Sequence, residues 1–168
     1  METQRNWKRV HPNTYFFWVG DKKIGELELH YAQSKNKAMA NIEGQLYVIE
    51  RKGFWKNRLE ITNSKGETVL KGYPLKWFSD TMELNYQNTK LNLKVRNNPL
   101  AEYAITDATG DRIAYGVKAQ NGAVYTQIST SENQADYLLD FLLWYLFHPV
   151  AQDNSGDSQV FYTLLMAQ

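Results

Sequence analysis

Residues 137–149, YLLDFLLWYLFHP, constrain the fold of this chain more than any other segment. The first eleven positions hold ten apolar or aromatic side chains and one carboxylate, Asp140. A helix that is apolar on every face must be buried on all sides. Because Ser131 begins a capping box and Pro149 supplies a stop, we expect a buried helix over about residues 132–148.

The same segment is too short to span a membrane. Eleven helical residues at about 1.5 Å each reach roughly 16 Å, whereas the hydrocarbon core of a bilayer is about 30 Å thick. No cluster of Lys or Arg flanks His148 and Pro149 to anchor the helix at an interface. We therefore predict no transmembrane segment and a sheath of protein around the helix. A helix packed across one open sheet and a membrane-inserted helix are the alternatives.

The residues before the helix read as short strands. Leu91, Leu93 and Val95 alternate with polar residues, which is the pattern of a strand with one buried face. Similar alternation runs from about residue 14 to 128, with turn-forming Gly, Asn, Asp and Pro between the runs. Such a series without helices predicts a mainly β fold, an antiparallel closed β-barrel of about 12 strands that encloses one hydrophobic helix near the C-terminus.

Two segments of this series repeat each other, ITNSKGETVLKG at Ile61–Gly72 and ITDATGDRIAYG at Ile105–Gly116. In both, an Asn or Asp and then a Gly stand at the corners of a turn, so each copy predicts a β-hairpin. WVGDKKIGEL is a weaker third version, with its tip at Gly20–Lys23. The repeated unit therefore suggests a barrel built from similar hairpins.

The pattern I-x-[ND]-x-x-G-x-x-[VI], at Ile61–Val69 and Ile105–Ile113, followed by a very apolar helix, resembles the tubby-like superfamily. Its members include the tubby C-terminal domain, the plant LURP-one-related proteins and the phospholipid scramblases. The resemblance covers roughly residues 15–150 and implies a barrel around a central helix. In parts of the family it also implies association with membrane phosphoinositides or phospholipid. This chain departs from the pattern after the helix, where VFYTLLM predicts an extra strand over about residues 159–167.

Composition narrows the classes of function. A chain of 168 residues is of single-domain size, so we treat residues 1–168 as one β-barrel domain. The lack of Cys excludes disulfides, thiolate metal sites and cysteine nucleophiles. A net charge of +1 provides no overall field for gathering nucleic acid. The first ten residues lack the apolar stretch of a signal peptide, so we expect a cytoplasmic location.

The segment ERKGFWKNR, Glu50–Arg58, is the main binding candidate. Basic residues surround Phe54 and Trp55, a combination that suits an anionic lipid head group at a membrane surface. The alternative is an exposed turn whose aromatic residues cover one end of the barrel. The candidate lipid- or anion-binding residues are Arg51, Lys52, Trp55, Lys56 and Arg58.

Asp140 is the one carboxylate in the apolar part of the helix. A buried carboxylate without a partner costs several kcal/mol or stays protonated. We therefore expect the barrel wall to supply either an Arg or Lys or a group of hydroxyl and backbone donors. The alternative is that Asp140 faces the barrel mouth and stays in water.

Catalytic and metal-binding motifs are scarce. The three histidines lie far apart, and the chain has no zincin, nucleophile-elbow or phosphate-loop motif. Glu26 and Glu28 share a strand face, as solvated neighbours commonly do. Asp107 and Asp111 fit the start of a calcium loop, but Arg112 stands where that loop needs Gly. We predict no catalysis, no metal site and no cofactor.

These observations favour a non-catalytic binding or scaffold domain. Its expected partner is a membrane phospholipid or phosphoinositide head group or another protein, with no nucleic acid, and its expected location is cytoplasmic and peripheral at the membrane. The alternative is a lipocalin-like carrier of a small apolar ligand, which would require an empty barrel interior. Gly53–Trp55 has the G-x-W form of lipocalins, although that signature belongs near the first strand.

Overall fold

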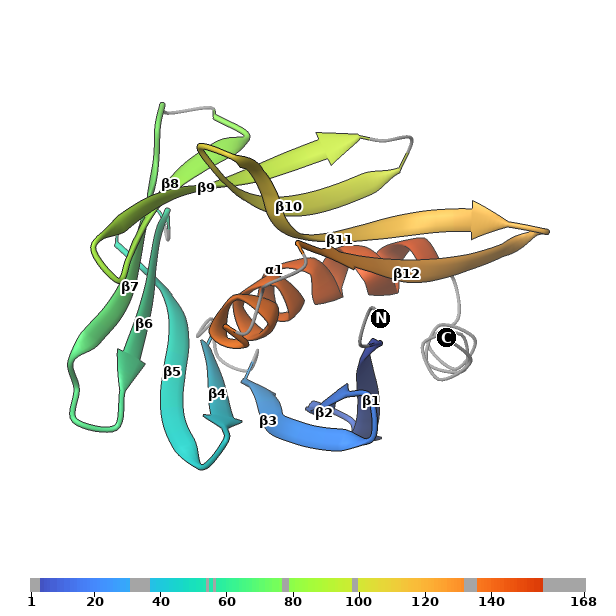
Figure 1. The fold of residues 1–168 in the computed structure, drawn as a ribbon, viewed down its shortest axis with the longest axis horizontal. Helices are drawn as coiled ribbons and strands as arrows, with labels where there is room; N and C mark the ends of the chain where they lie inside the picture. Colours follow the sequence, from blue (N-terminus) through green and yellow to red (C-terminus); the bar gives the residue numbers. More distant parts are fainter. Residues whose placement is uncertain are drawn as a thin grey trace.

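A computed structural model describes residues 4–30, 37–53, 55, 57–76, 79–97, 100–131 and 136–155. Within these residues, twelve strands form one sheet and a single helix follows them (Figure 1). Every strand pairs antiparallel with its neighbours in the chain, so the order in the sheet is the order in the sequence. The strands are β1 (Arg5–His11), β2 (Thr14–Val19), β3 (Lys22–His30), β4 (Lys37–Ile42), β5 (Gln45–Lys52), β6 (Arg58–Asn63), β7 (Thr68–Pro74), β8 (Thr81–Tyr86), β9 (Thr89–Asn97), β10 (Ala101–Asp107), β11 (Gly110–Gln120) and β12 (Ala123–Thr130).

The sheet curls around helix α1 (Leu138–Ser155) and nearly closes into a barrel (Figure 1). The predicted fold class is confirmed, with the difference that the barrel is nearly closed. No ladder joins β1 to β12 among the residues described, so a seam remains between the first and the last strand. The inner faces of the strands and the helix form one core, whose largest fully buried side chains are Trp7, Trp144, Tyr15, Tyr115, Phe17, Phe141 and Phe147.

The repeated segments form the predicted hairpins, β6–β7 and β10–β11. Both hairpins shift register at the same place in the repeat, after Ile61 in the first and after Ile105 in the second. In the first hairpin, the Asn63 side-chain oxygen accepts hydrogen bonds from two turn amides, each at 3.0 Å, and Gly66 has a positive φ of 77°. The third version of the repeat forms the β2–β3 hairpin. The local sequence thus specifies each turn, as the repeat predicted.

Two strands lie outside the expected pattern. Strand β1 lies before residues 14–128, the region in which strands were predicted. It was not predicted because the basic residues of RNWKRVH obscure the apolar signal of the buried Trp7. In β4, the inward residues Ala38 and Ala40 are small and give a weak apolar signal. Their size has a structural reason, since β4 is one of the strands that the helix backbone approaches most closely.

The helix occupies different residues from those expected. It begins at Leu138, where the Asp136 side chain caps it by accepting a hydrogen bond from the Leu138 amide at 3.2 Å. It continues to Ser155, so Pro149 lies inside the helix and does not end it. The predicted range of 132–148 is therefore shifted toward the C-terminus. The predicted extra strand at 159–167 lies outside the described residues.

Helix and wall come into close contact at Gly25 on β3. A Cβ atom at this position would lie 2.9 Å from the Phe141 ring and 2.1 Å from the Asn41 carbonyl oxygen. Both distances are shorter than real Cβ contacts allow, so only glycine fits here. The aromatic face of the helix is thereby seated directly against the backbone of the barrel.

Candidate functional site

Of the five basic and aromatic candidates of Glu50–Arg58, the structure describes Arg51, Lys52, Trp55 and Arg58, and the three basic ones among them do not share one face of the sheet. Arg51 pairs across the sheet with Leu59, which is fully buried, so Arg51 points toward the inner face. Lys52 pairs with Arg58, and both point to the outer face. Successive side chains of a strand alternate between faces, and this separates Arg51 from Lys52. Lys56, like Phe54, lies outside the described residues.

On the outer face, Lys52 and Arg58 are engaged by carboxylates in what we call the Glu60 cluster: Glu50, Lys52, Arg58 and Glu60. The Lys52 Nζ lies 2.8 Å from Glu60 and 3.2 Å from Glu50, and the Arg58 Nε lies 3.6 Å from Glu60. The hydrogen bond with Glu60 raises the pKa of Lys52, and the same bond lowers the pKa of Glu60. Two of the predicted anion-binding cations therefore already have anionic partners.

Trp55 lies in the turn between β5 and β6, and 67% of its surface is exposed. Leu75 follows β7 and is 53% exposed. In an antiparallel meander, the β5–β6 and β7–β8 connections lie at the same end of the barrel. We call this the Trp55 end; it presents large apolar side chains to solvent.

Arg51 approaches the helix near the same end. Burial raises the pKa of Tyr145, on α1, to about 12, and the positive charge of Arg51 opposes that rise. Arg51 therefore lies close enough to act on a side chain of the central helix. None of the described carboxylates lies within ion-pair distance of Arg51.

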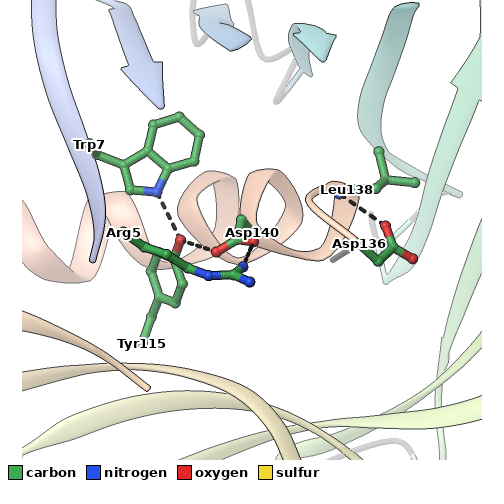
Figure 2. Close-up of polar contacts among 6 residues, drawn as sticks. All are labelled: Arg5, Trp7, Tyr115, Asp136, Leu138 and Asp140. Atoms are coloured by element: carbon green, nitrogen blue, oxygen red, sulfur yellow. Dashed lines mark hydrogen bonds and ion pairs between the residues drawn. The ribbon is translucent and has the colours of Figure 1, made fainter. Parts of the chain in front are cut away.

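Asp140 is fully buried and belongs to a polar cluster that spans the barrel seam (Figure 2). The Arg5 guanidinium, from β1, donates to Asp140 Oδ2. The Tyr115 hydroxyl, from β11, donates to Asp140 Oδ1 at 2.8 Å, and the Trp7 indole donates to the Tyr115 hydroxyl at 2.9 Å. The wall thus supplies both kinds of partner that the sequence analysis expected. We call Arg5, Trp7, Tyr115 and Asp140 the Asp140 cluster.

The Asp140 cluster joins elements that no backbone ladder joins. Arg5 and Trp7 come from the first strand, Tyr115 from the strand before the last, and Asp140 from the helix. Burial raises the pKa of Asp140 to about 7, against the opposing influence of Arg5 and Tyr115. Burial also raises the pKa of Tyr115 well above its usual value, which keeps its hydroxyl protonated as a donor.

A second buried polar pair lies further along the helix. The Tyr15 hydroxyl and the His148 Nε2 are 2.5 Å apart, and the His148 ring packs edge-on against Trp144. Burial, with a smaller contribution from Arg9, lowers the pKa of His148 to about 4, so the ring is neutral at pH 7. His148 is 3% exposed and Asp140 is 0% exposed, which suits structural roles better than contact with a substrate.

The weaker motifs are accounted for by local contacts. Asp107 accepts hydrogen bonds from the Thr109 amide and hydroxyl within its hairpin turn, at 2.7 and 2.6 Å. Asp111 forms a two-point ion pair with Arg96, with nitrogen–oxygen distances of 2.6 and 2.8 Å. Glu26 and Glu28 are neighbours on an exposed face, and each lies near a basic side chain of β3, Lys23 at 3.6 Å or His30 at 3.3 Å.

Sequence reasoning identified Asp140 but neither Arg5 nor Tyr115. Arg5 is 135 positions away in the chain and Tyr115 is 25 positions away. Only the curvature of the barrel places β1 and β11 beside the same turn of the helix. The sequence signal that could have identified Arg5 is its position two residues before Trp7, on the same face of β1. It could not be used because β1 was not predicted.

Comparison of the chain with protein-family models, curated proteins and solved structures finds no match. In the part of the chain that the structure describes, no helix is long and apolar enough to cross a membrane. The same residues contain no group of three or more His, Cys, Asp or Glu side chains placed to hold a metal ion.

Proposed function

We propose that this protein is a non-catalytic binding domain that docks on the surface of an anionic phospholipid membrane through its Trp55 end. The observation that carries the proposal is the exposure of Trp55, 67% of whose surface is in contact with solvent. Tryptophan is favoured at the boundary between lipid head groups and acyl chains, where its ring is buried and its N–H stays hydrated. Leu75, at the same end, extends the apolar contact.

Charge plays the smaller part in this proposal. The Glu60 cluster balances Lys52 and Arg58, so they contribute little net attraction. The exposed Lys76 and the half-buried Arg51, which points inward near this end, are further basic side chains, and a basic residue near an anionic membrane contributes about 1 kcal/mol. We therefore expect weak, peripheral binding that depends on apolar contact first and on anionic lipid second. This agrees with the phospholipid association that the tubby-like resemblance implies, and with a cytoplasmic protein at the membrane.

Co-sedimentation with vesicles tests the proposal. We expect the protein to sediment with phosphatidylcholine vesicles that contain phosphatidylserine, and less with pure phosphatidylcholine. Trp55→Ser should abolish sedimentation, and Arg51→Gln combined with Lys76→Gln should remove the preference for phosphatidylserine.

Leu46→Ser is the matched control, because Leu46 is 51% exposed at the start of β5, toward the opposite end of the barrel. It should bind as the unmodified protein does. Failure of the unmodified protein to bind either vesicle would overturn the proposal, and so would equal losses in Trp55→Ser and Leu46→Ser.

The packed interior speaks against the carrier alternative. Leu139, Phe141 and Leu142 of the helix are fully buried against the wall. The helix therefore occupies the volume that a lipocalin-like carrier would leave for its ligand. A ligand of this domain is better sought at the ends of the barrel than inside it.

A further inference from the structure

A cavity of about 450 Å³ lies at the end of the barrel opposite Trp55, where helix α1 begins. Residues of the β4–β5 hairpin, the β8–β9 hairpin and the start of the helix line it. Its volume lies within the range of small-ligand sites in proteins, about 300–1,000 Å³. Its polar lining consists of three tyrosines, two glutamines and two carboxylates: Tyr47, Tyr86, Tyr137, Gln45, Gln87, Glu43 and Asp136.

Three hydroxyl and amide donors of this lining, on Tyr47, Tyr86 and Gln87, already point at acceptors of the protein. The Tyr47 hydroxyl donates to Gln45 Oε1 at 2.6 Å, and Gln87 Nε2 donates to the Tyr86 hydroxyl at 3.0 Å. Burial and a hydrogen bond with Asp136 raise the pKa of Tyr86, so its hydroxyl stays protonated and donates to that carboxylate. These three donors are thus used within the protein, while the carboxylate oxygens of Glu43 and Asp136 can accept hydrogen bonds from a ligand.

The charged side chains of the lining also favour a cationic ligand. Both of its charged side chains, Glu43 and Asp136, are acidic, and no Lys or Arg is among the described lining residues. The nearby Lys22 pairs with Glu43 at 2.7 Å, but both side chains are largely exposed, at 69% and 49%, so this pair can exchange with a ligand. The positive end of the helix dipole is met by Asp136, which caps the helix.

We propose that this cavity binds a primary alkylammonium group, a cation on a short apolar stem. Three N–H donors would meet the oxygens of Glu43, Asp136 and the tyrosines, whose rings also attract cations. Ile42 and Leu138, the two aliphatic lining residues, would contact the stem. A free small amine and a lysine side chain of another protein share this chemistry. The site is independent of the membrane-docking end.

Titrations followed by amide NMR shifts of the full chain test the proposal. The probes are n-butylamine, the neutral n-butanol and Nα-acetyl-lysine-N-methylamide at pH 7. We expect both amines to shift the amides of Gly44, Gln87 and Leu138, with n-butanol binding at least about tenfold more weakly because it lacks the charge. Tighter binding of the lysine derivative would identify a protein side chain as the ligand, and tighter binding of n-butylamine would identify a free amine.

Two variants remove charge while keeping the local structure. Glu43→Gln retains the size of the side chain, and Asp136→Asn retains a good helix cap. Each should weaken amine binding several-fold, and the pair together by at least about tenfold. Glu67→Gln, in the β6–β7 turn at the same end, is the matched control and should bind as the unmodified protein does. Equal shifts with n-butanol, unchanged affinity in the double variant, or the same shifts with inorganic phosphate would overturn the proposal.

Discussion

The Asp140 cluster and the Glu60 cluster use the same chemistry but differ in how far their basic side chains are exposed to water. In each, a carboxylate meets a basic side chain, Asp140 with Arg5 in one and Glu60 with Lys52 in the other. Asp140 and Arg5 are 0% and 8% exposed, whereas Glu60 and Lys52 are 11% and 38% exposed, so the cation of the second pair stays in contact with water. A charge enclosed by protein depends on its partner, while a charge in contact with water can lose its partner at small cost. We therefore expect the ion pair of the Asp140 cluster to be needed for the stability of the barrel, and the ion pairs of the Glu60 cluster to tolerate substitution.

Replacing the buried carboxylate should have the largest effect. Asp140→Leu removes the carboxylate to which the buried Arg5 guanidinium donates, and a guanidinium does not release its proton. We expect the free energy of unfolding, measured by urea denaturation, to fall by about 3–5 kcal/mol. The double variant Arg5→Met with Asp140→Leu should recover much of that loss, because no unpaired charge remains. If the double variant is no more stable than the single one, packing and not charge is responsible.

Replacing Arg5, the buried cation, should lower the free energy of unfolding by less, and the loss should depend on pH. In Arg5→Met the remaining group, Asp140, can take up a proton, since burial already raises its pKa to about 7. We expect the destabilisation to be smaller than in Asp140→Leu, and to shrink by up to about 1.4 kcal/mol for each pH unit as the pH falls from 8 toward 7, below which Asp140 is protonated with or without Arg5. Urea denaturation at several pH values measures this. A loss of the same size at pH 5 and pH 8 would contradict it.

Asp140 and His148, two buried groups of the helix, should oppose each other in the pH dependence of stability between pH 4 and 7. Asp140, with a folded pKa of about 7 against an ordinary 3.8, holds a proton in the folded state that the unfolded chain has released, so its contribution falls as pH rises from 4 to 7. His148, with a folded pKa of about 4 against 6.5, is neutral in the folded state while the unfolded chain is protonated, so its contribution rises over pH 4–6.5.

Removing one of these two groups should leave a pH dependence of stability that is due to the other. Asp140→Asn should become more stable as pH rises from 4 to 6.5, and His148→Gln should become less stable as pH rises from 4 to 7, at up to about 1.4 kcal/mol per pH unit. Thermal denaturation at fixed ionic strength gives both profiles. Leu46→Ser, at an exposed position on β5, changes no titratable group and should keep the profile of the unmodified protein. Parallel profiles in Asp140→Asn and His148→Gln would show that neither group titrates as described.

The smallest effect is expected on the outer face. Glu60→Gln removes the charge that holds Lys52 and Arg58, but Lys52 keeps Glu50 at 3.2 Å and stays in contact with water. The free energy of unfolding should fall by no more than about 1 kcal/mol, and by less at high salt. A loss comparable with that of Asp140→Leu would remove the distinction between the two clusters.

Much of the fold was predictable because short stretches of the sequence determine its elements. Alternation gives the faces of strands such as β9, the repeat gives the β6–β7 and β10–β11 hairpins, and the apolar run gives the central helix. Strand β1 was missed because its charged residues mask a single buried tryptophan. Pro149 was read as a stop because proline lacks an amide hydrogen, yet a helix can continue past the loss of one hydrogen bond.

The candidate sites were less predictable, because they depend on which strands meet. The need for a partner at Asp140 follows from burial alone, but its identity depends on the closing of the barrel, which brings β1 beside the helix. The separation of Arg51 from Lys52 was available from their adjacent positions in a strand. The carboxylates that engage Lys52 come from two strands, and only the register of β5 against β6 reveals them.

The sequential order of the strands has a consequence for how the chain reaches its native state. Each strand finds its partner next to it in the chain, so pairing can proceed hairpin by hairpin as the polypeptide is synthesised. The helix that covers the inner face comes after all twelve strands, so that face stays exposed to water until the helix has been synthesised. The contact between Arg5 and Asp140, 135 positions apart, therefore belongs to the last stage of folding. Until then the growing chain resembles an open sheet with one exposed apolar face. Such a face is prone to aggregation, so a chaperone would matter most at this stage.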